Sequence, residues 1–461
     1  MSIKTSQKEL TELPVNFNGN TGRGTPELTV PPQLTVNSSL NDILIFARQE
    51  NASDVHIGAL KPIIFRQFGY LKTITNEVLS PDQVNSLFTN ALPKAFLESF
   101  ENTGDAEYVH TINGYGRFRV AIMKQRNGWD LTARVIPMSI PKFENTGLTP
   151  ACMSLTKWAQ GMVLISGPAG CGKTTTLSVL IEMINQTRHD HIITIEAPIE
   201  IVYEPKQCQI TQREINTHTL SQANALRAAL REDPDILIVS ELRDLSSIQL
   251  AISAAETGHL VLGTMNTVNA IQTVSSVIDS FPAEEQSIVR NMISESLRGV
   301  ICQQLVPRKD GKGMVPAYEI LIVTPPVANL IRSNKMNQIN NAIMTSKSSG
   351  MILMDTSLEI LAKKEVISKE EACDRAQSST TMMQTITRKV ITKAALVAAA
   401  SNNEMIIPQL MKIGIIEEAS PTELKLKTNA DLAPDIIRMI AGNDFDKVWT
   451  CLQQLVAHGG N

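Results

Sequence analysis

The run Gly167-Pro168-Ala169-Gly170-Cys171-Gly172-Lys173-Thr174 constrains this chain most, because it matches the phosphate-binding pattern G-x-x-x-x-G-K-[ST]. An apolar, strand-like segment at 162–165 leads into the run, and a helix-like segment at 175–180 follows it. That order of strand, loop and helix is the context in which the pattern works. The glycines let the backbone turn its N–H groups toward phosphates, and the start of the helix adds partial positive charge. The sequence therefore predicts a site for ATP or a closely related nucleotide.

The residues at the end of this loop have separate predicted roles. Lys173 is expected to reach the β- and γ-phosphates, and Thr174 to ligate Mg²⁺. Thr175 completes the predicted nucleotide-binding stretch 167–175. The alternative is a glycine-rich turn that matches the pattern by chance, and the agreement of strand, loop and helix argues against it.

Composition limits the class of protein. The chain has 461 residues, 43% hydrophobic and 19% charged, so it is globular and has room for about three domains. A net charge of −4 offers no overall basic field, and no nucleic-acid partner is expected. No apolar run approaches about 18 residues and the start of the chain is polar, so neither a transmembrane segment nor a signal peptide is predicted. Six scattered cysteines without a C-x-x-C pair favour a reduced cytoplasm over a structural zinc site.

The pattern along the chain divides it into five parts. Residues 1–38 are rich in Pro, Gly, Asn and Thr and predict a flexible tail. Residues 39–136 predict a small α+β domain, and 137–147 a linker. Residues 148–370 alternate strand and helix patterns, as in a parallel sheet with helices on both faces. Residues 371–461 predict a helical C-terminal extension, with one short helix beginning near Pro434 and ending at Gly442.

Acidic and polar residues follow three further strands of the predicted sheet. The strand 192–195 ends at Glu196, with Glu200 four residues on; the strand 236–239 ends at Glu241; and the strand at 260–262 runs toward Asn266. The carboxyl ends of parallel strands meet at one edge, where ligands bind. Carboxylates from two strands can hold hydrated Mg²⁺ and orient an attacking water, and Glu241 is predicted to do both. For any single strand-end glutamate, the alternative is a solvated cap.

Several longer motifs resemble the motor ATPases of type IV pili and type II secretion, and within them the retraction (PilT-like) branch. The resemblance covers roughly residues 40–370. Its motifs are Ala229-Leu230-Arg231-Glu232-Asp233-Pro234-Asp235, Glu241-Leu242-Arg243-Asp244, Ala254-Ala255-Glu256-Thr257-Gly258-His259 and Phe281-Pro282-Ala283-Glu284-Glu285, with Ala52-Ser53-Asp54-Val55-His56 and Gly116-Arg117-Phe118-Arg119-Val120 upstream.

The resemblance implies a small PAS-like N-terminal domain and a RecA-like ATPase domain. It implies a ring, usually a hexamer, that works the inner-membrane platform protein of a pilus from the cytoplasmic face of the membrane. Glu241 stands at the Walker B glutamate, His259 at the first histidine of the His box, and Glu196 and Glu200 within the Asp box.

The resemblance extends to three arginines of the N-terminal domain. Arg117, Arg119 and Arg134 resemble the family's arginines that approach the nucleotide. The alternative for these arginines is an ordinary solvated strand face.

The chain departs from the family pattern at four positions. Ala197 replaces the aspartate of the Asp box, Asn266 the second histidine of the His box, Ser240 the glycine before the Walker B glutamate, and Ala328 the first arginine of a C-terminal motif. Losing one charge-stabilising group at a phosphoryl-transfer site can slow the reaction by about 10³-fold or more. The sequence therefore predicts sound nucleotide binding and leaves room for slow hydrolysis.

Four functions stay open at this point. The leading hypothesis is an ATP-hydrolysing retraction motor. An assembly or secretion ATPase commonly carries a four-cysteine zinc insertion, which this sequence lacks. A weakly hydrolysing ring subunit that assists a second retraction ATPase would fit Ala197 and Asn266. A DNA translocase is the remote alternative, because it needs a basic channel.

Overall fold

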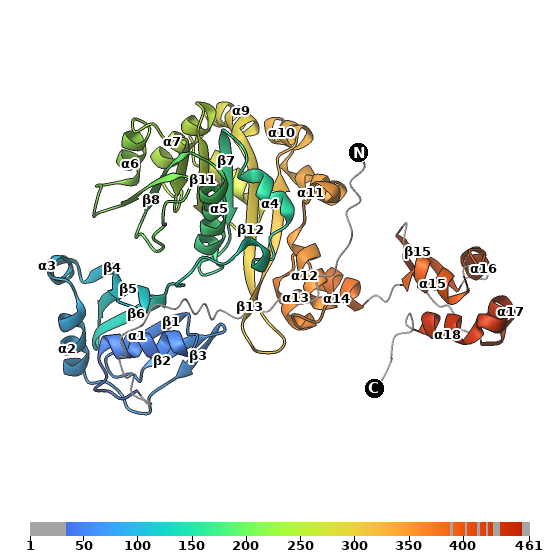
Figure 1. Cartoon of the computed structure of the whole chain (residues 1–461), viewed down its shortest axis with the longest axis horizontal. Coiled ribbons are helices and arrows are strands. Elements are labelled where there is room, and N and C mark those ends of the chain that lie inside the picture. The colour runs from blue at the N-terminus through green and yellow to red at the C-terminus, as the bar shows by residue number, and fades with distance from the viewer. Residues whose placement is uncertain are drawn as a thin grey trace. The chain divides into compact units, whose positions relative to one another are not determined.

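The computed structural model describes residues 34–387, 391–401, 403–412, 415–420, 423–426 and 434–453 (Figure 1). Most of the predicted tail, residues 1–33, lies outside the described residues. The described residues form two compact units, which divide between Ser357 and Leu358. The first unit contains two sheets, each with its own hydrophobic core.

The first sheet is antiparallel and six-stranded, in the order β3-β2-β1-β6-β5-β4. Buried and more open positions alternate along β5 and β6, and Phe65, Phe118 and Leu131 point into the core together with residues of helices α1 to α3. Ser39 and Ser80 start α1 and α2 with capping boxes. The elements are α1 Leu40–Gln49, β1 Asp54–Gly58, β2 Ile64–Gln67, β3 Tyr70–Thr73, α2 Pro81–Ala91, α3 Lys94–Thr103, β4 Asp105–Ile112, β5 Gly116–Gln125 and β6 Gly128–Val135.

The second sheet has seven strands in the order β13-β12-β7-β11-β10-β8-β9. Every neighbouring pair is parallel except β12 and β13, which form an antiparallel hairpin at one edge. The predicted parallel sheet is therefore confirmed, with one antiparallel edge strand added. The strands are β7 Gly161–Ser166, β8 His191–Glu196, β9 Gln209–Glu214, β10 Ile236–Val239, β11 Leu260–Met265, β12 Leu297–Pro307 and β13 Met314–Ile322.

Helices cover both faces of this sheet (Figure 1). Val163 and Ile165 of β7 pack toward α4 and α5, whereas Met162 and Leu164 pack toward the helices of the other face. A strand buried on both faces needs the continuous apolar run seen here, and each buried aliphatic side chain contributes about 1.5–3 kcal/mol. The first face carries α4 Pro150–Leu155 and α5 Lys173–Thr187; the second carries α6 Gln222–Ala229, α7 Leu245–Glu256, α8 Ala270–Asp279, α9 Gln286–Ser296, α10 Pro325–Arg332 and α11 Ile339–Thr345.

The second unit is mainly helical, as predicted, and it also contains a small antiparallel sheet that was not expected. The sheet has the order β14-β16-β15, and its core includes Leu396, Leu410, Leu424 and Leu452. The predicted helix at Pro434 is confirmed. Helix α12 Met354–Lys363 crosses the division between the units. The elements after it are α13 Lys369–Arg375, α14 Ser379–Thr387, β14 Ile391–Thr392, α15 Lys393–Ala399, α16 Ile406–Lys412, β15 Ile416–Ser420, β16 Glu423–Leu426, α17 Pro434–Ala441 and α18 Phe445–Gln453.

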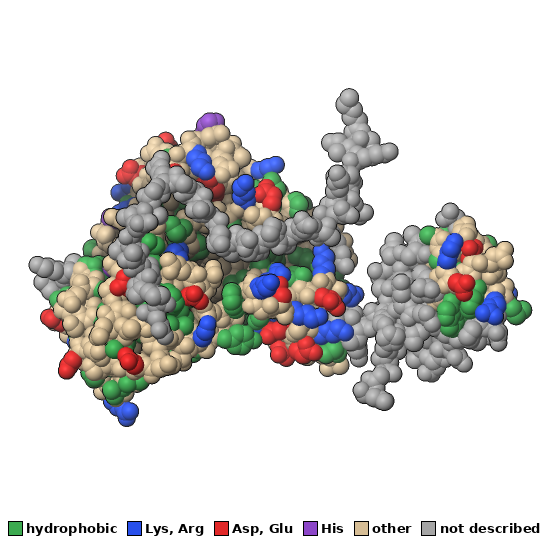
Figure 2. Space-filling view, turned by 60° about the horizontal axis from the view of Figure 1, so that its bottom comes forward, with side chains coloured by type: hydrophobic (Ala, Val, Ile, Leu, Met, Phe, Trp, Pro, Cys, Tyr) green, Lys and Arg blue, Asp and Glu red, His purple; other side chains and the backbone are tan. Residues whose placement is uncertain are grey.

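The described surface carries charges of both signs. On the face drawn in Figure 2, Lys and Arg side chains are interspersed with Asp and Glu side chains. Within the described residues, no helix is both long enough and apolar enough to cross a lipid bilayer.

Candidate active site

The predicted phosphate loop connects β7 to α5 at the carboxyl end of the parallel strands. Gly167, Gly170 and Gly172 all adopt positive φ angles, of 145°, 77° and 92°. A Cβ atom at Gly167 would lie 2.3 Å from the carbonyl oxygen of Gln303, so only glycine fits there. The outer turn at Pro168, Ala169 and Gly170 is exposed. The loop is therefore closely packed against the sheet and open on its outer side.

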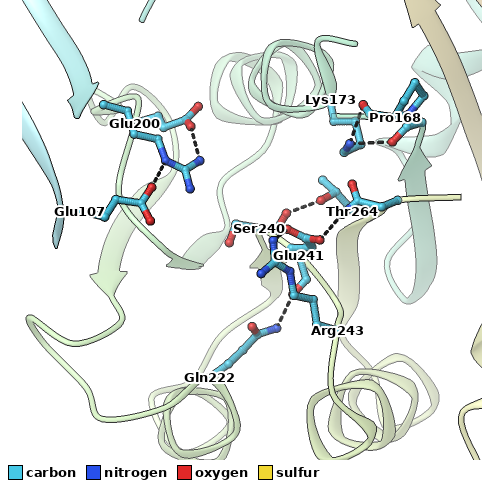
Figure 3. Close-up of polar contacts among 12 residues, drawn as sticks. Glu107, Pro168, Lys173, Glu200, Gln222, Ser240, Glu241, Arg243 and Thr264 are labelled. Carbon is cyan, nitrogen blue, oxygen red and sulfur yellow. Dashed lines mark hydrogen bonds and ion pairs between the residues drawn. The ribbon is translucent and has the colours of Figure 1, made fainter. Parts of the chain in front are cut away.

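The side chains that follow the loop are placed to meet an anionic ligand. Lys173 donates from Nζ to the carbonyl oxygens of Gly167 at 2.7 Å and Pro168 at 3.0 Å (Figure 3). Burial lowers the pKa of Lys173; Glu241 partly offsets this effect, while Arg134 adds to it. Thr174 is exposed and Thr175 half-buried. A lysine bound only to loop carbonyls has donors that phosphate oxygens can take over.

Glu241 follows β10 at the same edge of the sheet. Its carboxylate accepts hydrogen bonds from Asn266, which follows β11, and from Arg243 at 2.6 Å. Gln222 donates to its carbonyl oxygen at 2.8 Å. Figure 3 shows Glu241, Arg243 and Gln222 at the same edge of the sheet as Lys173. The ends of β10 and β11 thus meet beside the phosphate loop, as expected. The Glu241 carboxylate is held there by hydrogen bonds, and 24% of the Glu241 side chain is exposed.

The two glutamates of the predicted Asp box lie in different surroundings. Glu196, at the end of β8, is buried and accepts hydrogen bonds from Thr194 at 2.6 Å and Gln212 at 3.0 Å. Burial raises the pKa of Glu196, and these hydrogen bonds oppose the rise. Glu200 instead contacts Arg119 of the first sheet. Among the described residues, neither carboxylate forms a hydrogen bond with Glu241, Asn266 or Arg243. Catalytic roles for Glu196 and Glu200 therefore stay predictions.

The three predicted arginines lie on two strands of the first sheet, β5 and β6. Arg119 bonds Glu200 through Nη1 at 3.1 Å and also pairs with Glu107. Arg117 donates to the carbonyl oxygen of Glu200 at 3.0 Å. Burial lowers the pKa of Arg119, but Glu107 and Glu200 outweigh burial and raise it. Arg117 and Arg119 therefore bind the β8–β9 connection of the second sheet, which places their guanidinium groups between the two sheets.

Arg134 pairs with Asp54 at 3.0 Å, and 47% of its side chain is exposed. Its charge acts on Lys173, whose pKa it helps to lower, so Arg134 lies within electrostatic range of the phosphate loop. To meet a bound phosphate group, this half-exposed guanidinium would have to exchange the Asp54 carboxylate for phosphate oxygens.

His259 is not part of this cluster within one chain. It precedes β11, and its carbonyl oxygen accepts from the N–H of Gly161 at the start of β7. Its Nδ1 lies 3.1 Å from the carbonyl oxygen of Ala254. The start of a parallel strand is the edge opposite the phosphate loop, so a catalytic role for His259 requires contacts that a single chain does not make.

Three contacting residues were not assigned a role from the sequence. Gln222 and Arg243 support Glu241, and Gln303 lies against the loop. Arg243 belongs to the motif Glu241-Leu242-Arg243-Asp244, and its place two residues after Glu241 could have indicated its role. Gln222 had no such signal, because it reaches Glu241 from α6 across the fold.

The donor set fits ATP with Mg²⁺. The positive-φ glycines leave backbone N–H groups for phosphate oxygens, and Lys173 adds a cation. The Thr174 hydroxyl and the Glu241 carboxylate are oxygen ligands of the kind that Mg²⁺ prefers.

Comparison with known proteins adds the family context. The model of the family described as "Type II/IV secretion system protein" matches residues 33–412. The chain is 41% identical over 338 residues to the type IV pilus retraction ATPase PilT of Pseudomonas aeruginosa, covering 73% of this chain and 98% of that protein. It is 33% identical over 331 residues to the type IV pilus ATPase PilU of that organism, covering 72% and 87%. A crystal structure of the pilus retraction motor PilT with bound ADP matches at a TM-score of 0.66 and 37% identity, over 75% of this chain and 99% of that one.

Proposed function

This chain belongs to the type II/IV secretion system protein family, and we propose that it is an ATP-hydrolysing motor that assembles as a homohexamer and powers type IV pilus retraction. One observation carries the proposal. An intact phosphate loop and the Glu241 carboxylate share one edge of the sheet, in a chain that is 41% identical to a retraction ATPase over 98% of that protein.

The site residues have distinct parts in the proposed reaction. Lys173 exchanges its loop carbonyls for phosphate oxygens and compensates their charge. Glu241, held by Asn266 and Arg243, orients the attacking water. Thr174 and Glu241 are the proposed Mg²⁺ contacts, and Mg²⁺ when bound stabilises negative charge on the phosphates.

Coupling to mechanical work is proposed to pass through the arginines. Arg117 and Arg119 link the first sheet to Glu200 of the second. A triphosphate that draws these guanidinium groups away from Glu200 changes the contact between the two domains. We propose that this change drives the inner-membrane platform protein of the pilus, with the ring at the cytoplasmic face of the membrane.

A second candidate is an accessory ring subunit that binds ATP, hydrolyses it weakly and assists another retraction ATPase. Two substitutions favour it. Ala197 removes a carboxylate from the Asp box, and Asn266 bonds Glu241 through an amide that cannot carry a proton between groups. The similarity to PilU fits either candidate.

Steady-state ATP hydrolysis by the purified oligomer with Mg²⁺ tests the proposal. Glu241→Gln should keep nucleotide binding and lower turnover by about a hundredfold or more. Glu101→Gln, the same chemical change at an exposed position on α3, is the matched control and should leave turnover unchanged. Turnover at background level in both the wild type and Glu241→Gln, with ATP still bound, would replace the motor by the accessory subunit. Equal turnover well above background would remove Glu241 from the reaction.

A further inference from the structure

A buried glutamine on β12 contacts both ends of the phosphate loop. Gln303 has 2% of its surface exposed. Its Nε2 donates to the carbonyl oxygen of Cys171 at 2.6 Å, and its Oε1 accepts from the hydroxyl of Thr176 at 2.6 Å. One side-chain amide thus joins the last part of the loop to the first turn of α5. Both hydrogen bonds are shielded from water, where an unmade bond is costly.

The backbone of Gln303 supports the beginning of the loop. Its carbonyl oxygen would lie 2.3 Å from a Cβ atom at Gly167, and its Nε2 3.1 Å from one at Gly172. Strand β12 pairs with β7 up to Cys302 opposite Ser166 and then continues to Pro307 with β13 as its strand partner. Gln303 is therefore the first residue of β12 beyond the end of β7, directly beneath the loop.

The hydrogen bond to Cys171 fixes the direction of the next N–H group. In a planar trans peptide the C=O and the following N–H point to opposite sides. A Cys171 carbonyl directed at Gln303 therefore turns the N–H of Gly172 away from β12, toward the open side of the loop. Phosphate-binding loops hold phosphates through backbone N–H groups directed in this way.

We propose that Gln303 is a positioning residue that presets the phosphate loop for phosphates without contacting the nucleotide. The proposal rests on the nucleotide-binding function proposed above. Gln303 also ties the loop to the hairpin of β12 and β13, so the loop and this edge of the sheet hold one geometry. Its removal should cost affinity for nucleotides because the loop must then be ordered during binding.

The test is Gln303→Met, which keeps the length of the side chain and removes both hydrogen bonds. Gln304→Met is the matched control, because adjacent strand residues point to opposite faces of the sheet. Titration of the full-length protein with fluorescent ATP and ADP should show affinity reduced by about tenfold or more for Gln303→Met. The rise in melting temperature on adding ATP should shrink in the same variant. Gln304→Met should behave as wild type in both measurements.

A purely structural role predicts a different result. It would lower the melting temperature without nucleotide and leave the affinity of the folded protein unchanged, and that outcome would overturn the proposal. If Gln303→Met does not fold, Thr176→Val removes one of the two bonds and should weaken ATP binding in the same direction, by less; unchanged affinity would refute the proposal. A wild-type chain that does not bind ATP would instead refute the proposed function.

Discussion

The ion pair between Arg119 and Glu200 gives a direct test of how the first domain responds to nucleotide. The two groups are 3.1 Å apart, with 32% and 16% of their side chains exposed. Unit charges at that distance attract by about 5 kcal/mol at an effective dielectric constant near 20. Desolvation, side-chain entropy and the sharing of Arg119 with Glu107 reduce the net coupling to about 1–2 kcal/mol.

If Arg119 leaves Glu200 to meet a bound triphosphate, Glu200 competes with the nucleotide. Glu200→Gln should then tighten ATP binding by about five- to thirtyfold, which is the coupling energy expressed as an equilibrium constant. This gain in ATP affinity should vanish when Arg119→Gln is also present, because Glu200 then has no Arg119 side chain to withhold from the nucleotide. Titration of the four proteins with a fluorescent, non-hydrolysable ATP analogue measures both effects. Unchanged or weaker binding by Glu200→Gln, or a gain that persists without Arg119, would refute the reasoning.

Three further predictions concern the loop and the buried carboxylate. Lys173→Ala should lower ATP affinity by about a hundredfold in titration, since a half-buried cation proposed to meet phosphate is lost, and normal affinity would contradict this role. Gly167→Ala should destabilise the first unit by about 2–3 kcal/mol in thermal unfolding, because its Cβ would meet the Gln303 carbonyl oxygen. Gly311→Ala is the control: it has open space around it and should cost only about 1 kcal/mol. Equal losses of stability in the two variants would argue against the clash. Because burial raises the pKa of Glu196, the folded chain binds that proton more tightly than the unfolded chain, and stability falls as pH rises from about 4.5 through the raised pKa. Glu196→Gln should remove this fall from the profile of melting temperature against pH, and an unaltered profile would show that another group causes it.

Local patterns predicted the parts of the site that lie next to one another in the sequence. The strand β7, the glycine loop and the start of α5 form one continuous signal, and β10 ends where its apolar run meets Glu241. His259 was instead given a catalytic role from its motif, although a residue that precedes a parallel strand lies at the opposite edge from the phosphate loop.

The contacts that were not predicted depend on the order of strands or domains. Gln303 supports the loop only because β12 lies beside β7, where Cys302 pairs with Ser166, 136 residues earlier in the chain. The bond from Arg119 to Glu200 joins two domains, and no periodicity within either one indicates it. The sheet of the second unit was missed because β14 has two residues and β16 four, too short for an alternating pattern.

The substitutions at the family's motif positions have unequal effects in this geometry. Ser240 keeps its backbone contacts, donating to Ile195 at 3.0 Å and accepting from Thr264, so its added hydroxyl leaves the end of β10 in register. Asn266 stands against the Glu241 carboxylate itself. An amide holds that carboxylate in place as an imidazole N–H would, but it has no proton to give or take near neutral pH. We therefore expect the proposed orientation of water by Glu241 to be retained in this chain, and proton transfer by the side chain at position 266 to be lost. The difference between a full motor and an accessory subunit accordingly depends on whether hydrolysis needs that transfer, which makes Asn266 the substitution with the greatest consequence for turnover.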